Sequence, residues 1–133
     1  MRLSLRIAIV LVVLTATLAV ILWPQPDKDE FVFTGSELPR LLDIGSTTCI
    51  PCKKMAPILN ALAHDYVGVF EVEFLDTRVN KELAEEFGIR LIPTQIFFNR
   101  QGLELYRHEG FMGREEILDT WIELGLDLTR GDN

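Results

Sequence analysis

The segment Cys49-Ile50-Pro51-Cys52-Lys53 contains two cysteines separated by two residues, and it is the most informative segment of the chain. If a helix begins at Cys49, the thiol lies at the positive end of that helix, where unpaired backbone N–H groups favour a thiolate and lower the pKa. Cys52 lies one turn later on the same side, where its thiol can resolve a mixed disulfide formed by Cys49. The motif is therefore a candidate redox pair.

A pair of cysteines at this spacing also occurs in zinc and copper sites. A four-thiolate zinc site needs a second pair, but the chain has only two cysteines, and His64 and His108 do not stand at ligand spacing from them. A copper site would need a third ligand near the pair. Met55, one turn after Cys52, is expected to face the core instead. We therefore favour a redox pair and keep a copper-binding pair as an alternative.

The start of the chain differs in composition from the rest. Arg2 and Arg6 precede 17 residues without a charge, and an acidic linker follows. A basic start before an apolar run predicts an N-terminal transmembrane or signal helix with its N-terminus on the cytoplasmic side. The apolar run continues past the best small-residue cleavage site, at 17–19, and ends at Trp23, which suits an interfacial anchor. We therefore favour an uncleaved signal-anchor over a cleaved signal peptide.

These features divide the chain into two parts. Residues 1–26 are the expected signal-anchor segment and linker, and residues 27–133 are the expected domain. The domain carries 11 Lys and Arg against 20 Asp and Glu, a formal charge of −9, which argues against nucleic-acid binding and against adhesion to anionic lipid. We expect a monomeric domain on the extracytoplasmic (periplasmic) side of the cytoplasmic membrane, held by a single-pass helix. A lone cysteine pair in such an exported chain indicates catalysis or metal binding rather than structural cross-linking.

Hydrophobic patterns along the domain alternate between strand spacing and helix spacing. Strands are expected at 31–33, 41–45, 67–75, 94–99 and 103–108, and helices at 49–66, 80–87 and 114–124. This order predicts an α/β fold with a central mixed sheet, whose first strands are parallel and joined by a right-handed crossover, flanked by helices on both faces. The cysteine motif follows the C-terminal end of a strand, where open α/β sheets keep their sites.

Three local expectations come from the same patterns. Thr48 is the expected N-cap of the helix at 49–66. In the strand at 67–75, the face predicted to meet the core carries Phe70, Val72, Phe74 and Asp76. In the helix at 114–124, the predicted apolar stripe consists of Ile117, Leu118, Trp121 and Ile122.

Five features of the domain stand in the order and at the spacing of one known family. They are Asp43, six residues before Cys49; the motif at 49–53; Met55-Ala56-Pro57-Ile58-Leu59; Gly88-Ile89-Arg90-Leu91-Ile92-Pro93-Thr94; and Gly110. On these features the chain resembles the thioredoxin family over roughly residues 30–126. They match that family's buried acid, redox motif, kinked helix, cis-proline segment and glycine after the hairpin.

The resemblance implies a thioredoxin-like fold and assigns roles to three residues. Cys49 attacks a substrate disulfide as a thiolate, and Cys52 resolves the mixed disulfide. Asp43, buried beneath Cys52, takes its proton directly or through water, and a carboxyl group in an apolar strand interior has a raised pKa. The alternative for Asp43 is an acid at a strand end that faces water. The Cys49–Cys52 disulfide is then the redox group, and no further cofactor or metal is expected.

Four residues are expected to bind substrate. The resemblance implies that Pro93 is in cis and lies against the disulfide, leaving Ile92 as a backbone edge with which a substrate pairs. The alternative is an ordinary turn proline before a strand. Ile50 and Pro51 stand between the cysteines. The resemblance also implies that a proline at position 51 goes with a reducing character.

Three positions depart from the family pattern, and the first is Ile50, which stands in place of the usual glycine. Thr48 stands where thioredoxins usually carry a tryptophan before the first cysteine, which changes the apolar contact surface beside the motif. Phe74 stands where the family usually carries a lysine near the buried acid, with Glu73 next to it. The negative charge of Asp43 is therefore expected to be less well compensated by a nearby positive charge than that of the buried acid in other members of the family.

These features together predict a thiol–disulfide oxidoreductase that acts as a dithiol reductant of disulfide-containing exported proteins, with cytochrome c maturation as one candidate role. A cytosolic reductase cannot reach such a domain. The resemblance to tethered extracytoplasmic thioredoxins implies a membrane thiol carrier of the DsbD/CcdA type as the electron donor. Two alternatives remain: a disulfide oxidase or isomerase, which Pro51 disfavours, and a non-catalytic copper-binding or assembly module that uses the two cysteines as ligands.

Overall fold

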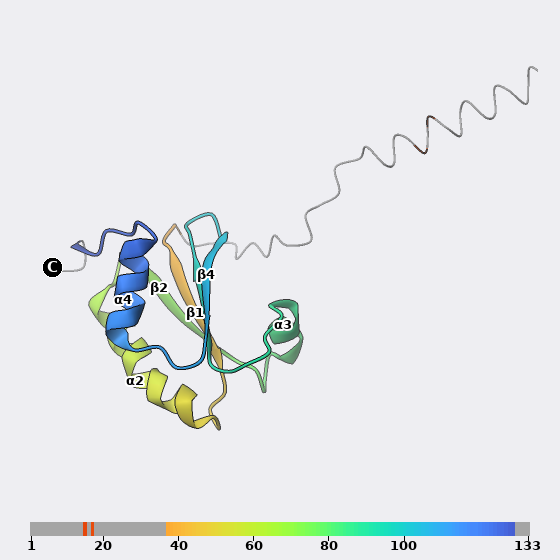
Figure 1. Cartoon of the computed structure of the whole chain (residues 1–133), viewed down its shortest axis with the longest axis horizontal. Helices are drawn as coiled ribbons and strands as arrows, with labels where there is room; N and C mark the ends of the chain where they lie inside the picture. The colour runs from red at the N-terminus through yellow and green to blue at the C-terminus, as the bar shows by residue number, and fades with distance from the viewer. Residues whose placement is uncertain (1–14, 16, 18–36, 130–133) are drawn as a thin grey trace, which may run out of the picture.

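The computed structural model describes Thr15, Thr17 and residues 37–129 (Figure 1). Within these residues, no helix has the length and apolar character needed to cross a membrane. The predicted anchor at 7–23, apart from Thr15 and Thr17, lies outside the described part of the chain, as does the predicted strand at 31–33.

A mixed sheet forms the centre of the described residues (Figure 1). Its four strands are β1 (Arg40–Gly45), β2 (Glu71–Asp76), β3 (Thr94–Phe98) and β4 (Glu104–Glu109), in the spatial order β2-β1-β3-β4. β1 runs parallel to β2 and antiparallel to β3, and β3 pairs antiparallel with β4. The predicted mixed sheet with parallel first strands is confirmed.

Three helices cover the two faces of this sheet. α2 (Ile50–Asp65) and α4 (Arg114–Glu123) lie on one face, and α3 (Lys81–Glu86) lies on the other (Figure 1). The inner strand β1 is apolar on both sides, because Leu41 packs toward α2 and α4 while Leu42 and Ile44 pack toward α3. The predicted α/β arrangement with helices on both faces is confirmed.

The hydrophobic core is divided into two clusters by the sheet. The cluster on the α2 and α4 side is the larger one, and its buried members are Leu41, Met55, Leu59, Leu62, Val69, Phe70, Phe97, Met112, Ile117 and Trp121. The cluster on the α3 side consists of Leu42, Ile44, Leu75, Ala84, Phe87, Ile96 and Phe98. The larger cluster supports α2 along its length and so fixes the position of the cysteine motif at its first turn.

Two predicted boundaries are wrong. Thr48 is not the N-cap of α2; Cys49 takes that position, and its side chain accepts a hydrogen bond from the Cys52 N–H. The strand predicted from residue 67 begins only at Glu71, whose N–H donates to the Pro39 carbonyl. Pro39 has no N–H with which to continue the ladder, so the preceding residues form a turn instead.

Two predicted core side chains are exposed. Phe74 is on the α2 side as expected but is 45% exposed, because β2 is an edge strand among the described residues and has no neighbour beyond it. Ile122 is 58% exposed because it follows Trp121 by about 100° around the helix, which turns it off the face that packs on the sheet. Ile117 and Trp121 are buried as predicted.

Candidate active site

The cysteine motif lies at the first turn of α2, directly after the loop that leaves β1. Cys49 is the N-cap, with extended backbone angles, and Pro51 stands in the first turn, where its missing N–H breaks no helical hydrogen bond. The Cys52 N–H donates to Cys49 Sγ over 3.3 Å. The helix terminus therefore presents a donor to Cys49 Sγ, which favours its thiolate form when the disulfide is reduced.

The two cysteines form a disulfide, with their Cα atoms 5.3 Å apart. Cys52 is only 4% exposed, whereas Cys49 is half-buried. Ile50 and Pro51, which join them, are both exposed, so the Cys49 side of the disulfide faces the surface. A partner from solution thus reaches Cys49 more readily than Cys52, as the expected roles of nucleophile and resolving thiol require.

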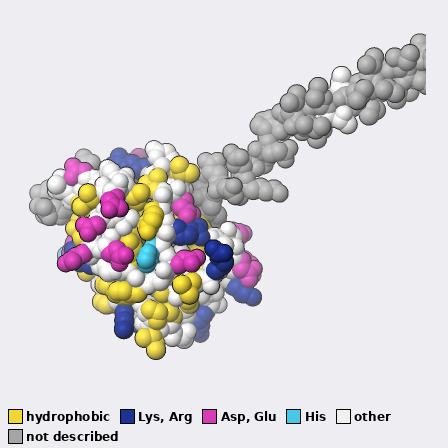
Figure 2. Space-filling model, in the orientation of Figure 1, with side chains coloured by type: hydrophobic (Ala, Val, Ile, Leu, Met, Phe, Trp, Pro, Cys, Tyr) yellow, Lys and Arg dark blue, Asp and Glu magenta, His cyan; other side chains and the backbone are white. Residues whose placement is uncertain are grey.

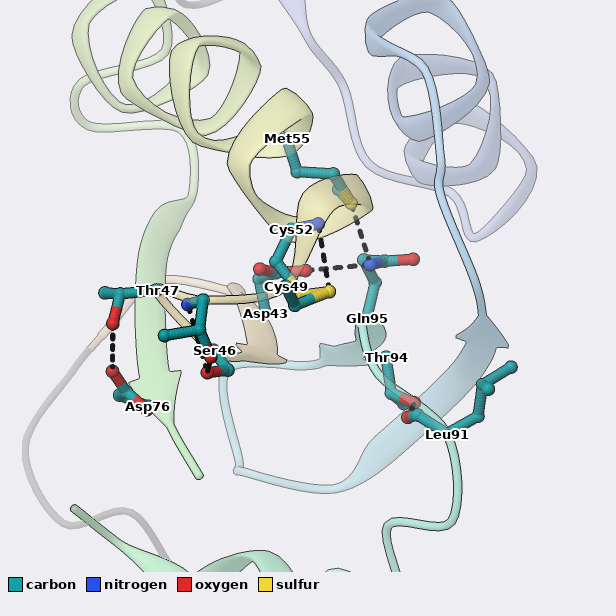
Figure 3. The surroundings of a disulfide bond; sticks show 11 residues. Asp43, Ser46, Thr47, Cys49, Cys52, Met55, Asp76, Leu91, Thr94 and Gln95 are labelled. Carbon is teal, nitrogen blue, oxygen red and sulfur yellow. Dashed lines mark hydrogen bonds between the residues drawn. A yellow bond between two sulfur atoms is a disulfide. The ribbon is translucent and has the colours of Figure 1, made fainter. Parts of the chain in front are cut away.

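Asp43 lies in β1, fully buried beneath the cysteine pair (Figure 3). Burial raises the pKa of this carboxyl group from 3.8 to about 6, and a hydrogen bond from Gln95 lowers it in part. Gln95 Nε2 lies 2.8 Å from Asp43 Oδ1, while Asp43 Oδ2 has no hydrogen-bond partner among the described residues. The expected alternative, an acid facing water at the strand end, does not describe this residue.

Gln95 is a site residue that the sequence reasoning missed. It is fully buried, pairs with Asp43 in the β1–β3 register, and donates to both Asp43 and Met55. One signal was available in the sequence. Gln95 and Phe97 alternate on the same face of a predicted strand, and a polar residue at a core position needs a partner.

The Ile92–Pro93 peptide bond is cis, as the resemblance implied. Pro93 is buried and Ile92 is half-buried. The next residue, Thr94, pairs with Ile44 near the end of β1 from which the loop to Cys49 departs. The Gly110 N–H donates to the Pro93 carbonyl over 2.8 Å. The proline loop and the cysteine motif therefore lie at the same end of the sheet.

The loop between β1 and α2 is held by short polar contacts. The Cys49 N–H donates to the Ser46 carbonyl over 3.1 Å, and the hydroxyl groups of Ser46 and Thr48 are 3.0 Å apart. Thr47 Oγ1 donates to Asp76 Oδ2 at the end of β2 (Figure 3). The pKa of Asp76 lies below its usual range, chiefly because the Arg78 N–H donates to it. These contacts fix the approach of the chain to Cys49.

The surface around this end of the sheet differs from the rest of the molecule. Figure 2 shows hydrophobic side chains gathered at the lower end, where α2 begins in Figure 1, and most of the Asp and Glu side chains of this face above them. Ile50, the first residue of α2, and Leu91, in the loop before Pro93, are exposed apolar residues. Within residues 37–129, no three His, Cys, Asp or Glu side chains are grouped so that they could hold a metal ion.

Comparisons with known proteins agree with this geometry. A family model described as Thioredoxin matches residues 27–123. The thioredoxin of Staphylococcus haemolyticus is 34% identical over 105 residues, which cover 77% of this chain and 97% of that protein. The M-type chloroplastic thioredoxin of Pisum sativum is 43% identical over 70 residues, which cover 53% of this chain and 40% of the pea protein.

A solved structure supports the same conclusion. The germline-specific thioredoxin Deadhead of Drosophila melanogaster superposes with a TM-score of 0.61 at 27% sequence identity, covering 67% of this chain and 83% of that one. Thioredoxins are thiol–disulfide oxidoreductases, and the disulfide at the first turn of α2 stands where such chemistry needs it. From its family-model match, its relatives and its fold, the chain belongs to the thioredoxin family.

Proposed function

We propose that this chain is a protein-disulfide reductase that keeps exported proteins in the dithiol state. The observation that carries the proposal is the asymmetry of the disulfide: Cys49 is half-buried at the helix N-terminus, and Cys52 is buried above a carboxyl group with a raised pKa. A pair built in this way separates an attacking thiol from a resolving thiol. Pro51 between them supports the reducing direction over the oxidising one.

The first step uses the reduced pair. The Cys49 thiolate attacks one sulfur of a substrate disulfide, a protein–substrate disulfide forms, and the other substrate sulfur leaves as a thiolate. The Cys52 N–H, which donates to Cys49 Sγ, favours the thiolate form of Cys49 before the attack. The cis-Pro93 loop, with Ile92 half-exposed beside it, supplies the backbone edge along which the substrate chain lies during this step.

The second step releases the substrate. Cys52 gives its proton to Asp43, and the resulting thiolate attacks Cys49 Sγ. The mixed disulfide breaks, the second substrate thiolate leaves, and the Cys49–Cys52 disulfide forms, so two electrons pass from the protein to the substrate. With a pKa of about 6, Asp43 is largely ionised at pH 7 and is able to accept this proton.

The place and partners in this proposal come from the N-terminal segment. Two arginines before 17 uncharged residues support a membrane anchor that holds the domain on the extracytoplasmic side. A dithiol reductant there must be re-reduced from across the membrane, which supports a membrane thiol donor of the DsbD/CcdA type. Apocytochrome c, whose haem-site cysteines must be reduced, is one candidate among its exported substrates.

The reduction potential of the Cys49–Cys52 pair tests the direction of transfer. The full chain, purified in a nonionic detergent, is equilibrated with dithiothreitol or glutathione buffers, and the fraction of free thiol is measured by mass. We expect a value near −270 mV, as for thioredoxin, rather than near −120 mV, as for a strong oxidant. A Pro51→His variant serves as the matched control and is expected to have the less negative potential.

The alternatives give different results in the same preparation. A wild-type value near −120 mV would mean that the chain introduces disulfides. A copper-binding module would bind Cu(I) stoichiometrically through both cysteines and would keep its function in cells when only electron transfer is blocked. Restoration of function by Cys49→Ser would contradict both redox functions, because that variant cannot form the disulfide.

A further inference from the structure

Phe74 is an aromatic residue beside the disulfide that the steps above do not use. It lies on β2, and its register partner on β1 is Asp43. Paired residues of neighbouring strands point to the same face of a sheet, so the Phe74 ring lies on the α2 side together with the acid. The side chain is 45% exposed. Part of the ring therefore meets water while the rest meets the protein.

Gly45 allows this ring to approach Cys52. A Cβ atom placed on Gly45 would lie 3.1 Å from Cys52 Sγ and 3.2 Å from Phe74 Cε2. The ring atom and the sulfur thus both border the space beside Gly45 and are at most 6.3 Å apart, the sum of these two distances. A side chain at position 45 would have to displace one of them. Gly45 thus leaves open the space between the Phe74 ring and Cys52 Sγ.

The two sulfurs consequently differ in what surrounds them. Cys49 stands at the helix end beside the exposed Ile50 and Pro51. Cys52 is 4% exposed, with its own helix on one side and the Phe74 ring on the side of β2. Because β2 is an edge strand among the described residues, no further strand there shields Cys52 beyond Phe74. On that flank β2 places the Phe74 ring and, two residues later, Asp76, the register partner of Gly45.

We propose that Phe74 is a positioning residue that covers Cys52 Sγ on the β2 side and so directs thiol–disulfide exchange with outside partners to Cys49. The inference rests on the proposed function and adds a determinant of which sulfur reacts. When an incoming donor thiolate attacks the oxidised pair, it bonds to Cys49 Sγ, the Cys49–Cys52 bond breaks, and Cys52 leaves as a thiolate. Attack on Cys52 instead would place the mixed disulfide on the buried sulfur, away from the surface.

Single-cysteine variants of the full chain in nonionic detergent test this inference. In Cys49→Ser, the Cys52 thiolate attacks oxidised glutathione, forms a mixed disulfide and releases one glutathione thiolate, and the rate is followed by mass. The same reaction in Cys52→Ser reports Cys49. Adding Phe74→Ala is expected to accelerate the reaction of Cys52 by about tenfold and to change that of Cys49 by less than about twofold. Phe74→Leu, which keeps an apolar cover, is expected to restore most of the protection.

The matched control is Tyr106→Ala, which removes another half-exposed aromatic ring from the other edge strand, β4. It should leave the reaction of Cys52 unchanged. The inference is overturned if Phe74→Ala changes Cys52 by less than about twofold, if both cysteines accelerate equally, or if Tyr106→Ala has the same effect. These reactions need neither substrate nor electron donor. If the chain fails as a reductase but Phe74→Ala still accelerates Cys52 and not Cys49, only the proposed function is overturned and the inference about Phe74 stands.

Discussion

Replacing Asp43 by asparagine is expected to make the stability of the oxidised protein less sensitive to pH. The carboxyl group is fully buried, and its pKa is raised from 3.8 to about 6. Folding therefore binds a proton between these two values. Stability contributed by the protonated acid is fully present below pH 3.8 and is lost as the pH rises to about 6, after which the loss is constant.

The magnitude follows from the size of the pKa shift. A rise from 3.8 to about 6 corresponds to about 3 kcal/mol at 1.36 kcal/mol per unit. Between pH 4 and pH 7.5 about 2 kcal/mol of this develops, because the unfolded group is already partly ionised at pH 4. Asparagine keeps the acceptor for Gln95 but places a donor where Asp43 Oδ2 has no partner in the described part of the chain. The free-energy cost of burying this unpaired amide donor does not change with pH.

The assay is urea unfolding of both oxidised proteins in detergent at the two pH values, followed by far-UV circular dichroism. The quantity of interest is the free energy of unfolding of Asp43→Asn minus that of the wild type. The pH-dependent contributions of the other carboxylates are the same in both proteins and cancel in this difference. The cost of the buried amide is the same at both pH values, so it does not affect the change in the difference between them. We expect the difference to rise by about 2 kcal/mol from pH 4 to pH 7.5. A difference that stays constant within about 0.5 kcal/mol would refute the raised pKa and the base role built on it.

Three further predictions concern the neighbouring residues. Cys49→Ser should lower the rate of protein-disulfide reduction by on the order of 10³-fold or more in a turnover assay, since Cys52 alone is buried; a loss below about tenfold would contradict its role as nucleophile. Gln95→Leu should raise the pKa of Asp43 above about 6, because it removes the hydrogen bond that lowers it; carboxyl ¹³C chemical shifts measured against pH check this, and a lowered pKa would count against the contact. Gly45→Val should destabilise the oxidised protein by about 1–3 kcal/mol in urea unfolding, since its Cβ would press on Cys52 Sγ; an unchanged midpoint would show that this site is not tightly packed.

Several features of the fold were predictable from local patterns in the sequence. The apolar run of β1, the helical spacing in α2 and the hairpin between β3 and β4 each depend on residues close together in the chain. Repeating apolar side chains impose the period of the element that buries them, so the pattern survives without knowledge of the neighbours. The spacing of Cys49 and Cys52 similarly determined that both thiols lie on one turn of a helix.

Other features depend on contacts that only packing creates. Gln95 meets Asp43 across 52 residues of sequence because β1 and β3 pair in one particular register, and a slip of β3 by one residue would turn Gln95 to the opposite face from Asp43. Phe74 fits the apolar pattern of a buried strand, yet its exposure follows from the place of β2 at the edge of the described sheet.

The elements, their order and the reactive pair could be predicted before folding was considered, because these follow from short-range spacing and side-chain chemistry. Packing sets how deeply each sulfur is buried, how far burial raises the pKa of Asp43, and which residues hold the acid in place. Desolvation and side-chain contact depend on the atoms that surround a group in space, and most of those atoms come from distant parts of the chain.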